Sequence, residues 1–295
     1  MLKQTNKVRV GYIPIVNCSA IFIAHENGYF RDAGIKVDLI PLIGGEKIMT
    51  ALQKGEVEIG FSNVASTIFG FDDGAKFISI VGGAAQDATC PVHGIFVRAD
   101  SHIQTVADLE NTKIAVNTNR AIDEVMVPPL VVKYGRDPSG IQFVPIPFPA
   151  MFVALKRNEV DAVVQIEPFV TIGNVDPEVR RISYNYVELQ PVTEISSMVA
   201  MQSWTEENPD QVQAFRQAII KAANFANTHS QETRSILSHY VALEKNILET
   251  LVLPRFIEGS LNERLFDEMI LRMRQAGWLK SDFSAADLIL KVQQD

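Results

Sequence analysis

Apolar residues in the first third of the chain occur in short runs typical of buried strands. Between these runs they recur every three or four residues, as in helices. This pattern predicts strands at 8–12, 36–41, 57–61 and 76–82, and helices at 20–29, 45–53 and 65–73. Strands that alternate with helices are typical of a mostly parallel sheet with helices on both faces. The first third therefore predicts an α/β unit.

The same order of elements begins again after Asp108. Here the pattern predicts strands at 113–117, 141–146 and 160–165, and helices at 121–134 and 149–157. A second alternating series of this kind predicts a second α/β lobe.

The two series also share a local pattern. Ala51–Ile59 (ALQKGEVEI) and Ala154–Ala162 (ALKRNEVDA) each predict a helix end, a tight turn and the start of a buried strand. Gly55 and Asn158 occupy the position where a helix commonly ends in a left-handed conformation, which Gly adopts freely and Asn better than most residues. Two related α/β lobes create a cleft between them, and small molecules bind in clefts.

Beyond Pro168 the chain is predicted to be irregular. Regular structure is interrupted there by Gly173, Pro177 and Pro191. Later elements are a strand at 195–201 and helices at 209–227, with Thr205 as N-cap, at 261–276 and at 284–293.

The helical tail needs a sheet to pack against, and the first lobe provides one. Lobe one is therefore expected to be discontinuous and to comprise 1–93 plus 198–295, with 94–197 as lobe two. The chain would cross between the lobes near 93–98 and near 193–200.

Composition narrows the classes of partner. The 295 residues are 47% hydrophobic and 21% charged, which suits a folded protein of two domains. A net charge of −8 and the lack of a Lys/Arg cluster among aromatic residues argue against nucleic acid. The start, Met1–Val10, does not have the pattern of a signal peptide, so the protein is either cytoplasmic or has lost a leader.

Motifs for catalysis and for metal binding are not apparent. The five histidines are scattered, and no phosphate loop, dinucleotide fingerprint or nucleophile elbow occurs. His25 and Lys47 could be imagined as a base and a Schiff-base amine, but core or surface roles are favoured for such isolated residues. We therefore expect a protein that is not an enzyme and that uses no cofactor and no metal.

Several segments together resemble a known family. They are Val8–Tyr12, Ala24–Phe30 (AHENGYF), Gly34–Leu39, Ala51–Asn63 (ALQKGEVEIGFSN), Val106–Val116, Ala154–Phe169 (ALKRNEVDAVVQIEPF) and Glu206–Pro209. In this order the segments are similar to extracytoplasmic substrate-binding proteins of the nitrate, sulfonate and taurine class of ABC transporters, a class that includes proteins for thiamine-pyrimidine precursors. The resemblance spans nearly the whole chain.

This resemblance implies a periplasmic-binding-protein-like fold of type II, with two α/β lobes joined by two crossover strands. It also implies an ABC permease as partner and a periplasmic or lipid-anchored extracytoplasmic location. A monomer is expected, and a cytoplasmic location stays open.

Polar loops follow the strands of both predicted lobes. In open α/β sheets, ligands bind beyond the carboxyl ends of the strands, near helix N-termini. The candidate ligand-binding residues are Asn17, Cys18, Ser19, Glu46, Ser62, Asn63, Gln86 and Asp87 in lobe one, and Asn119, Arg120 and Glu167 in lobe two.

Each candidate also has a purely structural explanation. Asn and Ser at these positions could cap helices without touching a ligand. Arg120 could anchor an anion or pair with Asp123 or Glu124 on its own helix. Glu167 could receive a ligand amine or hydroxyl, or pair with a surface lysine. Cys18 and Cys90 could form a disulfide, although free thiols are favoured.

The function expected is capture of a small organic anion or polar heterocycle in the cleft between the lobes, followed by delivery to the permease. A sulfonate, a carboxylate and a pyrimidine precursor all fit, because the candidates include one cation, several amides and acids at Glu46, Asp87 and Glu167. The alternatives are an enzyme of the pyrimidine-precursor synthase type, whose cysteine-rich motif this chain lacks, and a cytoplasmic ligand sensor.

Overall fold

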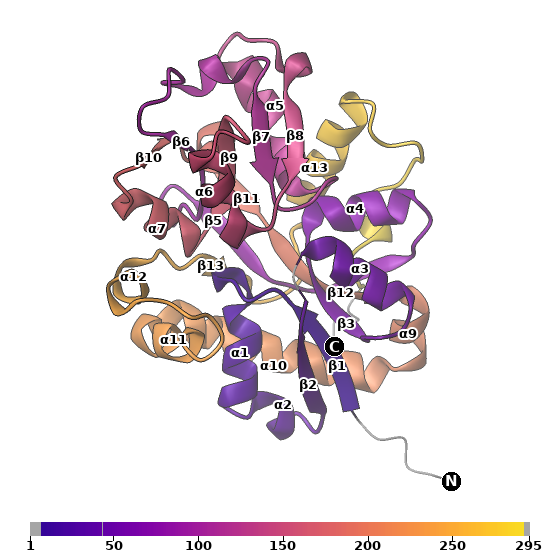
Figure 1. The fold of residues 1–295 in the computed structure, drawn as a ribbon. Helices are drawn as coiled ribbons and strands as arrows, with labels where there is room; N and C mark the ends of the chain where they lie inside the picture. The colour runs from indigo at the N-terminus through magenta and orange to yellow at the C-terminus, as the bar shows by residue number, and fades with distance from the viewer. Residues whose placement is uncertain (1–6, 43, 292–295) are drawn as a thin grey trace. The chain divides into compact units, whose positions relative to one another are not determined.

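The computed structural model describes residues 7–42 and 44–291 (Figure 1). Contacts divide the chain into two compact units. Unit 1 consists of 1–85, 194–242 and 255–295, and unit 2 consists of 86–193 and 243–254. Each unit contains a five-stranded sheet with helices, so the predicted α/β class is confirmed.

The sheet of unit 1 has the order β2-β1-β3-β12-β4. Its strands are β1 (Lys7–Tyr12), β2 (Lys36–Pro41), β3 (Ile59–Asn63), β4 (Phe77–Gly82) and β12 (Ser196–Met201). β1 runs parallel to β2 and β3, whereas β12 is antiparallel to β3 and β4. All five strands predicted for this unit are confirmed, although β3 begins at Ile59 instead of Val57.

Two groups of helices cover this sheet (Figure 1). The first is α1 (Ser19–Glu26), which follows η1 (Val16–Cys18), with α2 (Tyr29–Asp32), α10 (Pro209–Thr228) and α11 (Ser230–Leu237). The second is α3 (Gly45–Gln53), α4 (Val64–Asp72) and α13 (Glu263–Gln275). Gly60 of β3 permits the close approach of α3, because a Cβ atom there would collide with Ile48.

Three predictions for unit 1 are wrong in detail. The helix predicted at 20–29 is two helices, because Gly28 has a left-handed backbone (φ +73°). Thr205 does not cap α10: it lies inside α9 (Gln202–Glu207), where its hydroxyl donates to the Gln202 carbonyl at 2.7 Å.

In place of the helix predicted at 284–293, the structure has a single turn, η4 (Ala285–Asp287). The description of this segment ends at residue 291. Ser284 and Asp287 form a capping box around that turn. The chain then extends along β4, where Ser79 and Ile289 form a parallel bridge. Residues 292 and 293 lie outside the described range.

The sheet of unit 2 has the order β10-β6-β9-β7-β8. Its strands are β6 (His93–Arg98), β7 (Lys113–Val116), β8 (Gln142–Pro145), β9 (Ala162–Ile166) and β10 (Val179–Ser183). β7 runs parallel to β8 and β9, and β6 is antiparallel to β9 and β10. The strands predicted at 113–117, 141–146 and 160–165 are therefore confirmed.

Alternate residues of β6 serve the two faces of this sheet. Ile95 and Val97 belong to a core formed with α5 (Ile122–Lys133). Phe96 points the other way and makes an edge-to-face contact with Phe152 of α6 (Phe148–Lys156), with ring centroids 5.4 Å apart. The helices predicted at 121–134 and 149–157 are thus confirmed, and the sheet is covered on both faces.

The segment after Pro168, expected to be irregular, is regular. It forms α7 (Phe169–Val175), β10 and α8 (Asn185–Leu189). Gly173 does not interrupt α7: it allows the helix to pack closely, because a Cβ atom there would lie 2.6 Å from ring atoms of both Phe96 and Phe152. The segment 86–193 of unit 2 also contains two short 3-10 helices, η2 (Val106–Leu109) and η3 (Pro138–Gly140).

The chain crosses between the units in two short strands, β5 (Ala84–Asp87) and β11 (Val192–Glu194), which belong to a sheet of order β11-β5-β13. β13 is Arg255–Phe256. The segment 243–254, which contains α12 (Lys245–Thr250), belongs to unit 2, whereas the sequence placed it in lobe one. Its attachment depends on Glu167, whose Oε1 accepts a hydrogen bond from the Val252 N–H at 3.2 Å.

None of the helices among residues 7–42 and 44–291 has the length and apolar character needed to cross a membrane.

The C-terminal segment of unit 1 is attached to α4 through Asp72. The buried Asp72 carboxylate accepts hydrogen bonds from the N–H groups of Lys280, at 3.0 Å, and Ser281, at 2.8 Å. Burial acts to raise the pKa of Asp72, but the N–H groups of Ser281 and Lys280 outweigh it and hold this pKa below its usual value.

We predict that Asp72→Ala lowers the free energy of unfolding by about 1–3 kcal/mol at pH 7, because two N–H groups lose their acceptor. Since the folded-state pKa is lowered, the carboxylate's contribution is present above about pH 4 and is lost as the pH falls further. Urea unfolding at pH 7 and pH 3 measures both effects. Asp73→Ala is the matched control, because Asp73 pairs with Lys280 only at the surface, at 3.8 Å. Equal losses in the two variants would contradict the prediction.

Candidate functional site

Polar residues of unit 1 gather at the carboxyl ends of neighbouring strands. β1 and β3 are parallel and adjacent, so both end at the same edge of the sheet. Asn17 follows β1 within η1, and Ser62 and Asn63 end β3. Antiparallel β12 begins at this edge, where Ser196 is opposite Asn63. The Asn17 and Ser62 segments therefore lie at the same edge of this sheet.

Asn17 is a buried candidate of unit 1 whose side chain has no hydrogen-bond partner among the described residues. Its side chain is 2% exposed, and neither its amide nitrogen nor its amide oxygen forms a hydrogen bond. Leaving an amide buried and unpaired costs roughly 2–7 kcal/mol. A ligand or water that pairs with both atoms would remove this cost.

Three other candidates of unit 1 have local partners. The Ser19 hydroxyl donates to the Val16 carbonyl at 2.7 Å. The Ser62 hydroxyl accepts from Thr67 at 2.9 Å, and Asn63 caps α4 by accepting from the Ser66 N–H at 2.9 Å. These bonds account for the three residues without a ligand, but only Asn63 is a helix cap.

Cys18 and Glu46 complete the candidates of unit 1. Cys18 is buried, and burial raises the pKa of its thiol far above the usual range, so the thiol stays protonated and unreactive. Cys18 and Cys90 are both free, as the sequence favoured. Glu46 is exposed in the first turn of α3, where its charge suits the helix dipole.

The corresponding edge of unit 2 carries buried polar residues. β7 and β9 are parallel and end together, and antiparallel β6 begins there, with His93 opposite Ile166. Gln165 of β9 is fully buried: its amide donates to the Phe148 carbonyl at 3.2 Å, but its Oε1 has no partner. Gln86, which the contacts assign to unit 2, accepts from the Val92 N–H at 2.8 Å and leaves its Nε2 unpaired.

Glu167 is the buried acid that follows β9. Its carboxylate accepts from the Thr171 hydroxyl at 2.8 Å, the Thr171 N–H at 3.2 Å and the Val252 N–H at 3.2 Å. Burial nevertheless raises the pKa of Glu167 to about 7, against these donors and the charge of Arg181. Near neutral pH this carboxyl group can thus be either charged or neutral, and the surface lysine partner considered from the sequence is not present among the described residues.

A second buried acid, Asp123, stands after β7 in the first turn of α5. Tyr186 of α8 donates a hydrogen bond from its hydroxyl to Asp123. Burial raises the pKa of Asp123 to about 7. From the sequence, Asp123 was expected only as a partner of Arg120, and Tyr186 was missed because α8 was not predicted.

His93 connects this acid to Gln86. The His93 ring stacks on Tyr186 with centroids 4.2 Å apart, and its Nδ1 lies 3.3 Å from Gln86 Oε1. Burial lowers the pKa of His93 to about 3, so the ring is neutral. Its position at the first residue of β6, opposite the end of β9, was the available sequence signal, but β6 was not among the predicted strands. The edge of unit 2 thus offers neutral and acidic groups for hydrogen bonding.

The remaining candidates of unit 2 are Asp87, at the end of β5, and Asn119 and Arg120, in the loop between β7 and α5. Asp87 accepts from the N–H and hydroxyl of Thr89, at 2.8 and 2.6 Å. Asn119 and Arg120 are exposed. The backbone of Arg120 is left-handed (φ +52°), and its N–H donates to Glu124 at 2.9 Å. The charge of Arg120 also opposes the rise that burial causes in the pKa of Glu124. These contacts support pairing with Glu124, and anchoring of an anion by Arg120 stays a prediction.

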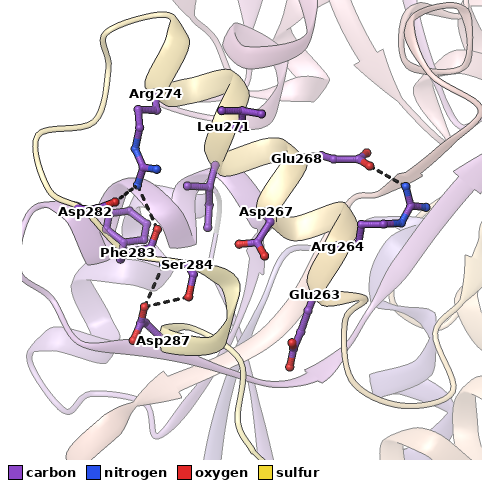
Figure 2. Close-up of a pocket in the computed structure, with 11 residues that line it drawn as sticks. Glu263, Arg264, Asp267, Glu268, Leu271, Arg274, Asp282, Phe283, Ser284 and Asp287 are labelled. Atoms are coloured by element: carbon purple, nitrogen blue, oxygen red, sulfur yellow. Dashed lines mark hydrogen bonds and ion pairs between the residues drawn. The ribbon is translucent and has the colours of Figure 1, made fainter.

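A hollow of about 1010 Å³ in unit 1 contains none of the candidates. Figure 2 shows it between α13 and the segment 282–287. Arg264 pairs with Glu268 at 2.7 Å, and Arg274 pairs with Asp282 at 3.0 Å. Three further acids, Glu263, Asp267 and Asp287, line the hollow, so its net charge is negative. Nowhere in residues 7–42 and 44–291 do three His, Cys, Asp or Glu side chains meet so that they could hold a metal ion.

Relatives of known name share most of this chain. A protein of Bacillus subtilis (strain 168) is 24% identical over 99% of the chain and 86% of its own length, and its name is "Putative aliphatic sulfonates-binding protein". A protein of Brucella abortus (strain 2308), named as a binding protein, is 23% identical over 92% of the chain and 80% of its own length.

Solved structures share the fold. The alkanesulfonate-binding protein SsuA of Xanthomonas axonopodis pv. citri, bound to MOPS, superposes with a TM-score of 0.83 at 16% identity, over 97% of this chain and 99% of that one. The periplasmic nitrate-binding protein NrtA of Synechocystis PCC 6803 gives 0.73 at 12% identity, over 97% and 86%. A Candida albicans protein described as having the generic periplasmic binding protein fold gives 0.79 at 15% identity, over 98% of each chain.

These superpositions confirm the periplasmic-binding-protein fold that the resemblance implied. The model of the family described as NMT1/THI5 like matches residues 15–233, which is more than half of the 295 residues. The chain therefore belongs to the NMT1/THI5-like family.

Proposed function

We propose that this protein is the solute-binding component of an ABC importer, and that it captures a small polar organic molecule and delivers it to a membrane permease. The observation that carries the proposal is the pair of strand-end edges, one in each unit, at which buried polar atoms lack partners. In unit 1 these atoms belong to Asn17, and in unit 2 to Gln86 and Gln165. Family membership and the names of the relatives support the same function.

The groups at these edges favour a ligand with N–H or O–H donors. The atoms of Asn17, Gln86 and Gln165 that lack partners include two amide oxygens, and two acids, Glu167 and Asp123, lie at the edge of unit 2. Among the described residues neither acid forms an ion pair. The other unpaired atoms are two amide nitrogens, Nδ2 of Asn17 and Nε2 of Gln86, so a ligand with both donors and acceptors would meet partners for all four amide atoms, whereas an anion would also meet the two acids. Of the ligand classes considered, an amino-substituted heterocycle fits these groups better than a sulfonate or nitrate.

We further propose that the protein binds its ligand and does not transform it, as the named relatives, all binding proteins, suggest. The buried Cys18 thiol and the neutral His93 offer no activated nucleophile or base. An extracytoplasmic location and a monomeric state complete the proposal. Recovery of unchanged ligand after prolonged incubation, measured by mass spectrometry, tests the non-catalytic role.

A thermal-shift screen tests the ligand class. We expect amino-substituted pyrimidines to raise the unfolding midpoint of the wild-type protein, because a ligand that binds only the native state stabilises it by mass action. At a concentration 100 times the Kd the gain is about 2.7 kcal/mol. Taurine, MOPS and nitrate should give smaller shifts. A larger shift with the sulfonates would overturn the proposed ligand class but would leave the transport function standing.

Single substitutions test whether each edge contacts the ligand. We expect Asn17→Ala in unit 1 and Gln165→Ala in unit 2 each to weaken binding of the screen's best compound by about tenfold, the cost of one or two lost hydrogen bonds. Isothermal titration calorimetry measures the Kd. Asn262→Ala is the matched control, because Asn262 caps α13 through the Leu265 N–H at 3.2 Å. An unchanged Kd in either variant would contradict a ligand contact at the edge that carries the substituted residue.

The raised pKa of Glu167 predicts a pH-dependent stability. Between about pH 4.5 and 7 the unfolded chain has lost the Glu167 proton while the folded protein retains it, so stability falls as the pH rises. The fall is up to about 1.4 kcal/mol per pH unit. Asp123 contributes in the same direction, since its pKa is raised from 3.8 to about 7.

We therefore expect Glu167→Gln to reduce the slope of unfolding free energy against pH in this window, measured by urea unfolding without ligand. Glu46→Gln, at an exposed candidate of unit 1, should leave the slope unchanged. An identical slope in the wild-type protein and Glu167→Gln would show that Glu167 has an ordinary pKa.

A further inference from the structure

The end of β10 adds a residue to the edge of unit 2. β10 is antiparallel to β6, with Val179 opposite Arg98 and Ser183 opposite Ile95, so β10 ends near the point where β6 begins. Asn185 is the first residue of α8 and lies two positions after the end of β10. The topology therefore places Asn185 at the same edge as His93 and Glu167.

The side chain of Asn185 is fully buried and has no partner. Its exposed fraction is 0%, and neither Oδ1 nor Nδ2 forms a hydrogen bond. Within residues 7–42 and 44–291, Asn17 is the other asparagine with both amide atoms in this state. Asn17 is at the strand-end edge of unit 1, so each edge contains one wholly unpaired amide.

The position of α8 does not depend on the Asn185 side chain. Tyr186 holds the helix through its bond to Asp123 and its stacking on His93. At the start of α8, the Tyr184 N–H donates to the Glu188 side chain at 3.0 Å. Because other residues attach α8, the cost of burying the Asn185 amide is not offset by a structural bond.

We propose that Asn185 is a specificity-determining residue that contacts the ligand through both amide atoms. This proposal rests on the solute-binding function proposed above. A carboxamide presents one acceptor beside one N–H donor. Its complement is a ligand edge with a donor next to an acceptor, as in a primary carboxamide or an amino group beside a ring nitrogen. A sulfonate or nitrate presents acceptors alone and would leave Oδ1 of Asn185 unpaired.

Two variants separate a ligand contact from a structural role. Asn185→Ala removes both polar atoms, and Asn185→Leu also fills most of the space. Replacing an unpaired buried polar group with an apolar one is neutral or stabilising, whereas removing a bonded one is destabilising. We therefore expect Asn185→Leu to unfold at the same urea concentration as the wild-type protein, or at a higher one, in the absence of ligand.

Binding is measured by calorimetry with cytosine and nicotinamide, which carry the donor–acceptor edge, and with MOPS, which does not. We expect both variants to weaken binding of cytosine or nicotinamide by tenfold or more. The control is Asn262→Ala, whose side chain caps α13 in unit 1. This control should lower stability and leave the affinity for each compound unchanged.

Three results would overturn the inference. If Asn185→Leu unfolds more easily than the wild-type protein, the amide is structural. If Asn17→Ala weakens binding while both Asn185 variants keep the wild-type affinity, Asn185 does not contact the ligand and the solute-binding function stands. If the wild-type protein binds none of the three compounds and none of the other compounds in the thermal-shift screen, the solute-binding function itself fails.

Discussion

Parallel pairing of neighbouring strands is the constraint on which the rest of the structure depends. Because β1 and β3 run in the same direction, the loops after them emerge at one edge of unit 1, and β7 and β9 impose the same order on unit 2. Antiparallel β12 and β6 each add the first residues of a strand to these edges. Residues far apart in the sequence, such as Asp123 and Glu167, are thereby brought to a common edge without a specific contact between them.

The polar residues at these edges divide into two groups by their hydrogen bonds. Ser19 bonds to the Val16 carbonyl, Ser62 to the Thr67 hydroxyl, and Asn63 to the backbone of α4, so their presence is explained by the fold. Asn17 and Gln165 retain atoms that the fold does not satisfy. Since an unpaired buried amide destabilises the folded state, a chain that keeps such groups at the strand ends has given up stability there. Ligand recognition is the physical gain that would offset this loss.

The sequence predicted regular elements well wherever apolar spacing was clear. The strand at 36–41 and the helix at 45–53 have the predicted bounds, and the matched segments around Gly55 and Asn158 both end in left-handed residues. The segment after Pro168 was missed because Gly173 signals a break in sequence, whereas its actual effect is close packing against two aromatic rings. Because β10 and α8 were not predicted, the contact between Tyr186 and Asp123 could not be predicted either.

Burial explains why residue type alone could not identify the site. Exposed Arg120 is the one cation among the candidates predicted from the sequence, yet its N–H and its charge act on neighbouring Glu124. Glu167 and Asp123 are acids, opposite in charge to Arg120, and both are buried. Burial raises each pKa to about 7, so each carboxyl group can be protonated or ionised near neutral pH. An edge made of such acids, a neutral histidine and amides can adjust its donors and acceptors to a ligand without an ion pair. Tertiary placement, which sequence spacing does not report, is therefore what separates the proposed binding groups from the helix caps.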